Sequence, residues 1–470
     1  MKGMVSWAYR PFRPQAANDR TKLPFVCRIA PFEGGFEFEW FDAGSDGAHE
    51  LTVNKSGETA PVLVRTVFDP VVTVDGLEDL CDYTFTVSRV GGEGSVTRLV
   101  RTGKFPGDSV VNYLCPHDQE YSFSGFFLAG PNVIKCPSGK LIASMDVFFN
   151  KEYISGLTLL YYSEDGGRSW RYLCDLFPCY WNKLFFVNGS LYAIGATSGV
   201  GDVVIGRSDD EGKTWSAPVI LFGSSYDQGY HSAPGTIVER DGVLSIAVSF
   251  GGWKERAFRM GIMSVRTDSD LLDPASWELS DLAGYDPSWE NAPQNAGPGL
   301  DCPGAGIEGN VVVGPDGILR ALYRMDIYKG IPNTGKLLIF KVDPTDRSAP
   351  LIFDRIADCP LGSNSKFCVD FDPVSGLYVM IGTEQSLEEN WGRTVISMAV
   401  SSDLYSWKIV KRLYDHHDMD PAKAGLQYPD FKFDGDDILM VLRLGWNCPD
   451  TYHNSNCISF TRVKNFRQYF

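Results

Sequence analysis

The chain has 470 residues, of which 44% are hydrophobic, 13% are aromatic and 48 are glycine. This length suits one small and one large domain, and the many aromatic and turn-forming residues favour an all-β fold. The net charge of −16 argues against nucleic acid or an anionic membrane as a partner, because both attract basic surfaces.

The cysteines and the N-terminal residues bear on the compartment. The 11 cysteines include no Cys-x-x-Cys pair, the first residues contain no apolar signal segment, and no apolar run reaches transmembrane length. We therefore expect a cytoplasmic protein with reduced, mostly buried thiols. A secreted protein that lacks its signal peptide is the alternative.

Residues 22–104 contain several strand patterns, among them FEFEWFD (36–42) and YTFTVSRV (83–90). Leu77 and Tyr83 stand six residues apart, just before an alternating strand. This pattern resembles the fibronectin type III domain, in which such a tyrosine lies at a strand corner and its hydroxyl binds the backbone. We expect a domain of this kind over 1–115, and any other small β-sandwich is the alternative.

After residue 125, an apolar run, a glycine turn and a second apolar run recur six times. The turn glycines are Gly139, Gly189, Gly242, Gly317, Gly376 and Gly435. Their mean spacing of about 59 residues suits a four-stranded propeller blade. Six such blades closed around an axis leave no long exposed edge, so we expect a six-bladed β-propeller over 116–470.

A second motif, Ser-x-Asp-x-Gly-x-Ser/Thr-Trp, occurs at 163–170 and 208–215, and weaker versions occur at 267–277 and 401–407. Its aspartate accepts backbone N–H groups in a tight turn and its tryptophan packs between blades. We therefore expect structural roles for Asp165 and Asp210. These Asp boxes resemble those of the sialidase superfamily of β-propeller glycosidases, and the resemblance covers roughly 125–470. Some lyases and binding proteins carry such boxes too.

In a propeller the first strand of each blade begins at the mouth of the central axis, so residues at these starts should converge. Many of them are polar, which a purely structural strand does not require. The candidates at these starts are Asn132, Trp181, Asn182, Lys183, His231, Glu308, Lys366, Tyr428 and Asp430. Second strands end in Asp146, Arg324 and Arg443, and a late loop adds His453.

The resemblance to sialidases assigns roles to several of these positions. Glu308 and Arg324, 16 residues apart, resemble the family's Glu and Arg of the fourth blade. Arg393 resembles an arginine of the next blade, and Tyr428 is placed similarly to the nucleophilic tyrosine. In that chemistry the glutamate is the base for the tyrosine, and arginines hold the sugar carboxylate.

The chain departs from that pattern in two segments. The segment AGPNVIKCP (129–137) contains no arginine where sialidases have Arg-Ile-Pro, so the three-arginine clamp is incomplete. The loop VFFNKEYIS (147–155) offers Glu152 as its one carboxylate where the family has an acid/base aspartate. We therefore expect a relative that acts on another sugar rather than a classical sialidase.

These observations predict an exo-acting glycoside hydrolase that needs neither a metal ion nor a cofactor, with an oligosaccharide as its substrate. The candidate catalytic residues are Glu308, Asp146, Asp430 and Tyr428. Two structural alternatives stay open: Asp430 pairs with Arg443, and Tyr428 forms a wall of the sugar site. The candidate substrate-binding residues are Arg324, Arg393, Arg443, His231, Lys366, Trp181, Asn182 and His453.

Other readings of the same residues remain. Trp181, Trp253 and Trp446 are candidate sugar-stacking platforms, with core packing as the alternative. A lyase for uronic-acid glycans would use histidine and tyrosine as base and acid, and a non-catalytic carbohydrate-binding propeller would need no converging carboxylates. His416 and His417 lie in an acidic loop, which we interpret as solvated rather than as a metal site.

Overall fold

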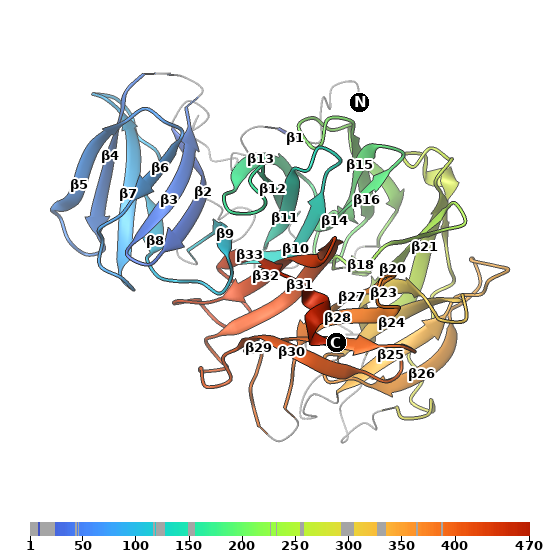
Figure 1. Cartoon of the computed structure of the whole chain (residues 1–470). Coiled ribbons are helices and arrows are strands. Elements are labelled where there is room, and N and C mark those ends of the chain that lie inside the picture. The colour runs from blue at the N-terminus through green and yellow to red at the C-terminus, as the bar shows by residue number, and fades with distance from the viewer. Residues whose placement is uncertain are drawn as a thin grey trace.

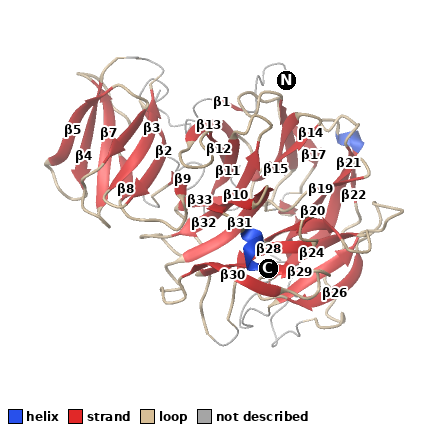
Figure 2. Ribbon diagram, viewed as in Figure 1, coloured by secondary structure: helices blue, strands red, loops and turns tan. Residues whose placement is uncertain are grey.

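The computed structural model describes residues 8–9, 24–42, 45, 47–115, 118, 127–148, 156–225, 227–231, 233–253, 258–292, 305–326, 335–362, 365–386 and 389–470. Within these residues the regular structure is almost entirely strand, as predicted (Figures 1 and 2). The helical segments of this described part are two short 3-10 turns, η2 (Pro274–Ser276) and η3 (Phe466–Tyr469). No helix in this part of the chain is long and apolar enough to cross a membrane.

Two sheets form the N-terminal part, drawn in blue in Figure 1. One contains β2 (Phe25–Phe32), β3 (Gly35–Phe41) and β6 (Val71–Val74); the other contains β5 (Pro61–Val67), β4 (His49–Lys55), β7 (Asp82–Arg89) and β8 (Arg98–Arg101). Phe36 and Phe38 of the first sheet pack on Phe85 of the second, with ring centroids 4.9 and 4.8 Å apart. The Tyr83 hydroxyl accepts a hydrogen bond from the Glu78 N–H at 3.0 Å. The expected tyrosine contact is therefore present, while membership of the fibronectin type III family stays a prediction.

Six further antiparallel sheets, here called sheets 1 to 6, follow in chain order. Sheet 1 contains β10 (Phe127–Lys135), β11 (Leu141–Phe148), β12 (Leu157–Ser163) and β13 (Arg171–Leu176), with β1 (Ala8–Tyr9) at its edge. Sheet 2 contains β14 (Tyr180–Val187), β15 (Ser190–Ala196), β16 (Val203–Ser208) and β17 (Val219–Phe222). Sheet 3 contains β18 (Gly229–His231), β19 (Val238–Arg240), β20 (Val243–Gly251), β21 (Arg259–Arg266) and β22 (Trp277–Leu279).

The remaining three sheets have four strands each. Sheet 4 contains β23 (Ala305–Val313), β24 (Leu319–Asp326), β25 (Lys336–Lys341) and β26 (Ile352–Asp358). Sheet 5 contains β27 (Cys368–Asp372), β28 (Leu377–Thr383), β29 (Val395–Ser401) and β30 (Lys408–Asp415). Sheet 6 contains β31 (Gly425–Asp434), β32 (Asp437–Gly445), β33 (Cys457–Val463) and β9 (Ser109–Tyr113).

Sheet 6 joins the two ends of this series. Its fourth strand, β9, precedes sheet 1 in the chain and pairs with β33, while β31 packs against β10 of sheet 1 (Figure 1). β9 lies before the expected domain boundary between residues 115 and 116. Part of the expected N-terminal domain, 1–115, therefore contributes a strand to sheet 6. The boundary itself stays a prediction.

Local turn chemistry explains the repeat. The six turn glycines lie between the paired strands of each hairpin and have φ between 65° and 90°, a region that glycine adopts without steric cost. In the Asp boxes, Asp165 accepts from Ser169 N and Oγ at 3.0 and 2.6 Å, and Asp210 accepts from Thr214 N and Oγ1 at 2.8 and 2.7 Å. Burial opposes ionisation of Asp165, but these bonds lower its pKa to about 2. Both carboxylates therefore hold turns, as expected.

Candidate functional site

The site is built on β-bulges in the first strands of sheets 1, 2, 4 and 6. In each of these strands the register shifts over two residues. The first residue of each bulge has a left-handed backbone: Gly130 (φ 46°), Trp181 (56°), Glu308 (57°) and Tyr428 (55°). A bulge re-aims a side chain out of the ladder. A non-glycine residue with this φ costs roughly 1–3 kcal/mol and is typical of functional sites.

Tyr428 and Glu308, which are 120 residues apart, are in direct contact. The Tyr428 hydroxyl donates to Glu308 Oε1. Arg324 Nη1 donates to Glu308 Oε2 at 2.6 Å and lies 3.5 Å from the Tyr428 hydroxyl. All three side chains are buried, with residue exposures of 1% for Glu308 and 5% for the other two. The structure thus joins the tyrosine, the glutamate and the arginine into one hydrogen-bonded group.

Neighbouring charges and burial shift the pKa values of Glu308 and Tyr428 in opposite directions. Burial alone would raise the pKa of Glu308, but the Arg324 charge and the neighbouring His231 lower it below the usual range. Burial and the Glu308 charge raise the pKa of Tyr428 above its usual value, against the opposing effect of Arg324. At neutral pH the site therefore holds a carboxylate that accepts a hydrogen bond from an un-ionised tyrosine.

Two more arginines lie around Tyr428. The Arg443 guanidinium lies 4.8 Å from the centre of the Tyr428 ring. Arg393 donates to the Gln427 side chain. Burial and the charge of another arginine lower the pKa of Arg393 and of Arg443, which marks the site as electropositive. Although the segment 129–137 contains no arginine, this region still has three arginines, because β32 supplies Arg443 beside Arg324 and Arg393.

The strand register explains why Arg324 and Arg443 reach the same place. Arg324 on β24 pairs with Ile307, the residue before the bulge of β23. Arg443 on β32 pairs with Gln427, the residue before the bulge of β31. The two arginines therefore occupy equivalent positions in the first hairpins of sheets 4 and 6. Each lies opposite the residue that precedes the bulge, and so next to Glu308 or Tyr428.

Aromatic rings form one side of the site. The Trp181 ring lies 6.2 Å from the Tyr428 ring, with planes 16° apart. His231 packs edge-on against Trp181 at 4.7 Å and against Trp253 at 5.0 Å. Trp181, Trp253 and His231 therefore form one aromatic cluster, and their role in binding a sugar stays a prediction.

The loop between β32 and β33 contributes a residue that the sequence reasoning missed. Tyr452 has its ring centre 5.5 Å from the Arg393 guanidinium, and its carbonyl accepts from Gln427 Nε2 at 2.7 Å. The next residue, His453, accepts through its carbonyl from Arg443 Nη2 at 2.5 Å. Burial, followed by the Arg443 and Arg393 charges, lowers the pKa of the His453 ring to about 3. Tyr452 directly precedes the predicted His453 in the same loop, and this position in the sequence could have identified Tyr452 as a further candidate.

Asp430 and Lys366 belong to a separate buried cluster. Asp430 accepts from Lys183 Nζ at 2.6 Å and from Asn132 Nδ2 at 2.6 Å. Lys366 Nζ lies 3.9 Å from Asp430 and donates to the Pro429 carbonyl at 2.7 Å. The expected alternative that Asp430 pairs with Arg443 is wrong, because its cationic partner is Lys183 on β14. We call these four side chains, of Asn132, Lys183, Lys366 and Asp430, the lower layer.

Asp146 and Asn182 lie behind Trp181. Asp146 Oδ2 accepts from the Trp181 N–H at 3.1 Å, and Oδ1 lies 2.7 Å from Thr158 Oγ1. Burial raises the pKa of Asp146 to about 8. The Asn182 amide donates to Cys179 Sγ at 3.7 Å. Both residues contact the backbone or side chains around the bulge of β14.

Other candidates lie elsewhere. Trp446 Nε1 donates to the Lys104 carbonyl at 3.1 Å, and its ring lies 4.8 Å from His416, so this tryptophan contacts the segment that follows β8 rather than Tyr428. Glu152 lies outside the described residues. Among the residues that the structure does describe, no group of three or more His, Cys, Asp or Glu side chains could hold a metal ion.

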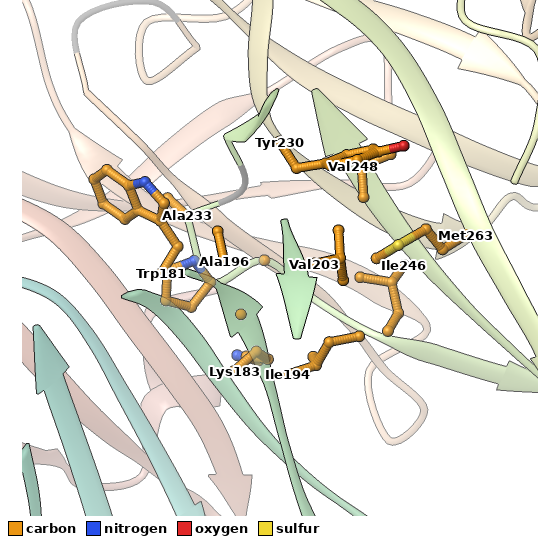
Figure 3. A pocket seen from close by; sticks show the side chains of 13 residues that line it. Trp181, Lys183, Ile194, Ala196, Val203, Tyr230, Ala233, Ile246, Val248 and Met263 are labelled. Carbon is orange, nitrogen blue, oxygen red and sulfur yellow. The ribbon is translucent and has the colours of Figure 1, made fainter. Parts of the chain in front are cut away.

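A small cavity lies next to Trp181, between sheets 2 and 3 (Figure 3). Its volume is about 20 Å³, which is enough for roughly one water molecule. Apolar side chains such as Val203, Ile246 and Met263 line most of it. It is too small for a sugar, so any glycan must bind outside it.

No protein-family model and no curated protein sequence matches the chain. Among solved structures it is similar to the Hadza microbial sialidase Hz136, with a TM-score of 0.50 and 14% identity over 95% of this chain and 94% of that chain. The GH93 α-L-arabinofuranosidase of Fusarium graminearum in complex with arabinobiose has a TM-score of 0.49 and 14% identity, with coverages of 77% and 98%. The Trypanosoma rangeli sialidase in complex with sialic acid has a TM-score of 0.48 and 14% identity, with coverages of 73% and 54%. The chain thus has a fold like that of the microbial sialidase, at an identity that identifies the fold and not the activity.

Proposed function

We propose that sheets 1 to 6 are the blades of a closed propeller and that the chain is a glycoside hydrolase that removes a terminal, carboxylate-bearing sugar. Contacts of β10 with β14, β23 with β27, β27 with β31, and β31 with β10 support a closed ring. The observation that carries the activity is the hydrogen bond from Tyr428 to Glu308 inside a group of arginines. A fold resemblance alone would not support it, because one fold hosts many activities.

The proposed reaction uses Tyr428 as the nucleophile. An un-ionised phenol is a weak nucleophile, so its proton must leave as the oxygen attacks the anomeric carbon. Glu308 already accepts this hydrogen bond and is the base. The product is a glycosyl-tyrosine, and water then displaces the tyrosine from the sugar. Two successive displacements at one carbon retain its configuration.

The arginines supply the binding of the substrate. A guanidinium group is planar and binds a carboxylate through two parallel hydrogen bonds. Arg393 and Arg443 are buried with depressed pKa values, so an anion between them would relieve mutual repulsion. Trp181 offers an aromatic face for the C–H groups of the sugar ring.

The other predicted carboxyl groups receive positioning roles in this proposal. Asp430 holds the strand two residues after Tyr428, and Asp146 holds the backbone N–H of Trp181. Within the described residues, neither carboxyl group forms a hydrogen bond with Tyr428 or Glu308. We therefore assign the chemistry to Tyr428 and Glu308 and the shape of the site to Asp430 and Asp146.

The test is a set of 4-methylumbelliferyl glycosides of sialic acid, glucuronic acid and arabinofuranose, with products identified by NMR and mass. The proposal expects release of an acidic sugar with gain of one water and retention at the anomeric carbon. An unsaturated product without added water would make the protein a lyase and shift the roles to His231, Tyr428 and Lys366. Binding of acidic glycans without any product would favour the non-catalytic propeller.

A further inference from the structure

His231 is a buried histidine whose two ring nitrogens face different groups. Nδ1 lies 3.0 Å from the Gly199 carbonyl oxygen, and because a carbonyl only accepts, Nδ1 carries a hydrogen. Nε2 makes no hydrogen bond within the described residues and lies 3.8 Å from Glu308 Oε1. The ring therefore turns the nitrogen that has no hydrogen-bond partner among these residues toward the carboxyl oxygen that binds Tyr428.

The surroundings keep the ring in this orientation. Trp181, Trp253 and Phe258 pack around it, with centroid distances of 4.7, 5.0 and 5.5 Å, and the residue is only 2% exposed. These rings carry no charge. Among the described residues, the charged group at ion-pair distance is Glu308 of β23, whose carboxyl also contacts Arg324 of β24 and Tyr428 of β31.

Glu308 alone is a poor final acceptor for the tyrosine proton. Arg324 binds its other oxygen and holds its pKa below the usual range, whereas the pKa of Tyr428 lies above its usual value. A proton moved from Tyr428 to Glu308 would therefore tend to return. A second base beside Oε1 removes this difficulty.

We propose that Nε2 of His231 is the final acceptor of the Tyr428 proton, which it receives through Glu308 Oε1. This role rests on the proposed hydrolase function. The 3.8 Å separation must shorten by roughly 1 Å for a hydrogen bond, and catalytic hydrogen bonds commonly tighten when substrate binds.

The two half-reactions balance for an aryl glycoside. In the first, the Tyr428 O–H bond breaks, an Nε2–H bond forms, the tyrosine oxygen bonds to the anomeric carbon, and the aryl oxide leaves. In the second, water bonds to that carbon, the tyrosine oxygen leaves and regains its proton from His231 through Glu308, and the water releases one proton to solvent. The net result is hydrolysis.

The kinetic test uses His231→Asn and His231→Gln. The asparagine amide keeps a donor for the Gly199 carbonyl, and the glutamine amide keeps a polar atom near the place of Nε2; neither has a basic nitrogen. We expect kcat on the aryl glycoside to fall roughly 10²- to 10⁴-fold with KM nearly unchanged. We also expect the acid limb of the pH–rate profile to move to lower pH, because Glu308 remains as the sole base.

The control is His417→Asn, which changes an exposed histidine bonded to Asp415 and should alter neither kcat nor the acid limb. Retention of wild-type kcat, or an unmoved acid limb, in both His231 variants would overturn the proposal. A purely structural role for His231 would not predict the move of the acid limb.

A second readout does not depend on turnover. Nitrogen-15 NMR of the histidine rings should show His231, identified by its loss in His231→Asn, as the Nδ1–H tautomer with a bare Nε2 at neutral pH. An Nε2–H tautomer, or an imidazolium that persists at mildly alkaline pH, would overturn the proposal even in an active hydrolase. The expected tautomer in a protein that hydrolyses no glycoside would instead overturn the proposed function, and this role with it.

Discussion

Two neighbouring groups of charged side chains, the lower layer and the arginines around Tyr428, differ in how their charges are balanced. In the lower layer, Asp430 is bonded to Lys183 and Asn132, so the protein itself neutralises the charge. Around Tyr428, by contrast, Arg393 and Arg443 donate to the uncharged oxygens of the Gln427 side chain and the His453 carbonyl. The lower layer is satisfied by the fold, whereas the arginine group would gain from an anion supplied from outside.

The β-bulge separates these two groups. Tyr428 stands at the bulge of β31 and Asp430 two residues later, where the regular pairing resumes. Trp181 and Lys183 have the same relation on β14. One irregularity in the strand thus divides the residues that we propose for ligand binding from those that we propose for stability, although all of them are buried.

The largest expected effect is on Tyr428. Tyr428→Phe removes only the hydroxyl and should lower kcat roughly 10³-fold or more, with little change in the free energy of unfolding. The measurement is kcat on the aryl glycoside that the wild type cleaves, with circular dichroism as the control for folding. A phenylalanine variant with wild-type kcat would show that Tyr428 is a wall of the site and not a nucleophile.

A substitution in the lower layer should lower the free energy of unfolding. Asp430→Asn leaves Lys183 as a buried cation without its carboxylate, and removing one partner of a buried ion pair costs about 3–5 kcal/mol of the free energy of unfolding. Urea unfolding measures this loss. The matched control is Asp268→Asn, which breaks the exposed Arg266–Asp268 pair and should cost less than about 1 kcal/mol. Equal losses in the two variants would contradict the assigned roles.

Arg443→Met tests whether the arginine group recognises a carboxylate. A hydrogen bond to a charged group contributes about 1.5–3 kcal/mol, so KM for an acidic aryl glycoside should rise roughly 10- to 100-fold. The methyl ester of the same sugar lacks the charge and should show little difference between variant and wild type. An equal rise for acid and ester would mean that Arg443 shapes the site without binding the carboxylate.

The last prediction concerns Asp146 and pH. Burial raises its pKa to about 8, so the folded protein keeps a proton that the unfolded chain releases above pH of about 4. This group therefore makes the protein less stable as pH rises between those values, by up to about 1.4 kcal/mol per pH unit. Asp146→Asn should flatten that part of the curve in urea unfolding across pH. A variant with the wild-type slope would show that Asp146 is ionised in the folded state.

The sequence by itself determined the features that depend on near neighbours in the chain. The glycine turns, the Asp boxes and the strand hairpins follow from local backbone and hydrogen-bonding chemistry, and the structure confirms them. The Glu308–Arg324 contact was also predictable, because one hairpin brings residues 16 apart together.

Only the tertiary structure decided which distant side chains meet. The Tyr428–Glu308 bond, the Asp430–Lys183 pair and the placement of Trp446 beside Lys104 join residues 120, 247 and 342 positions apart. The bulges set the direction of these side chains, and the packing of one sheet on the next sets their distance. Neither quantity is fixed by local sequence, because each depends on contacts between strands that fold far apart in the chain.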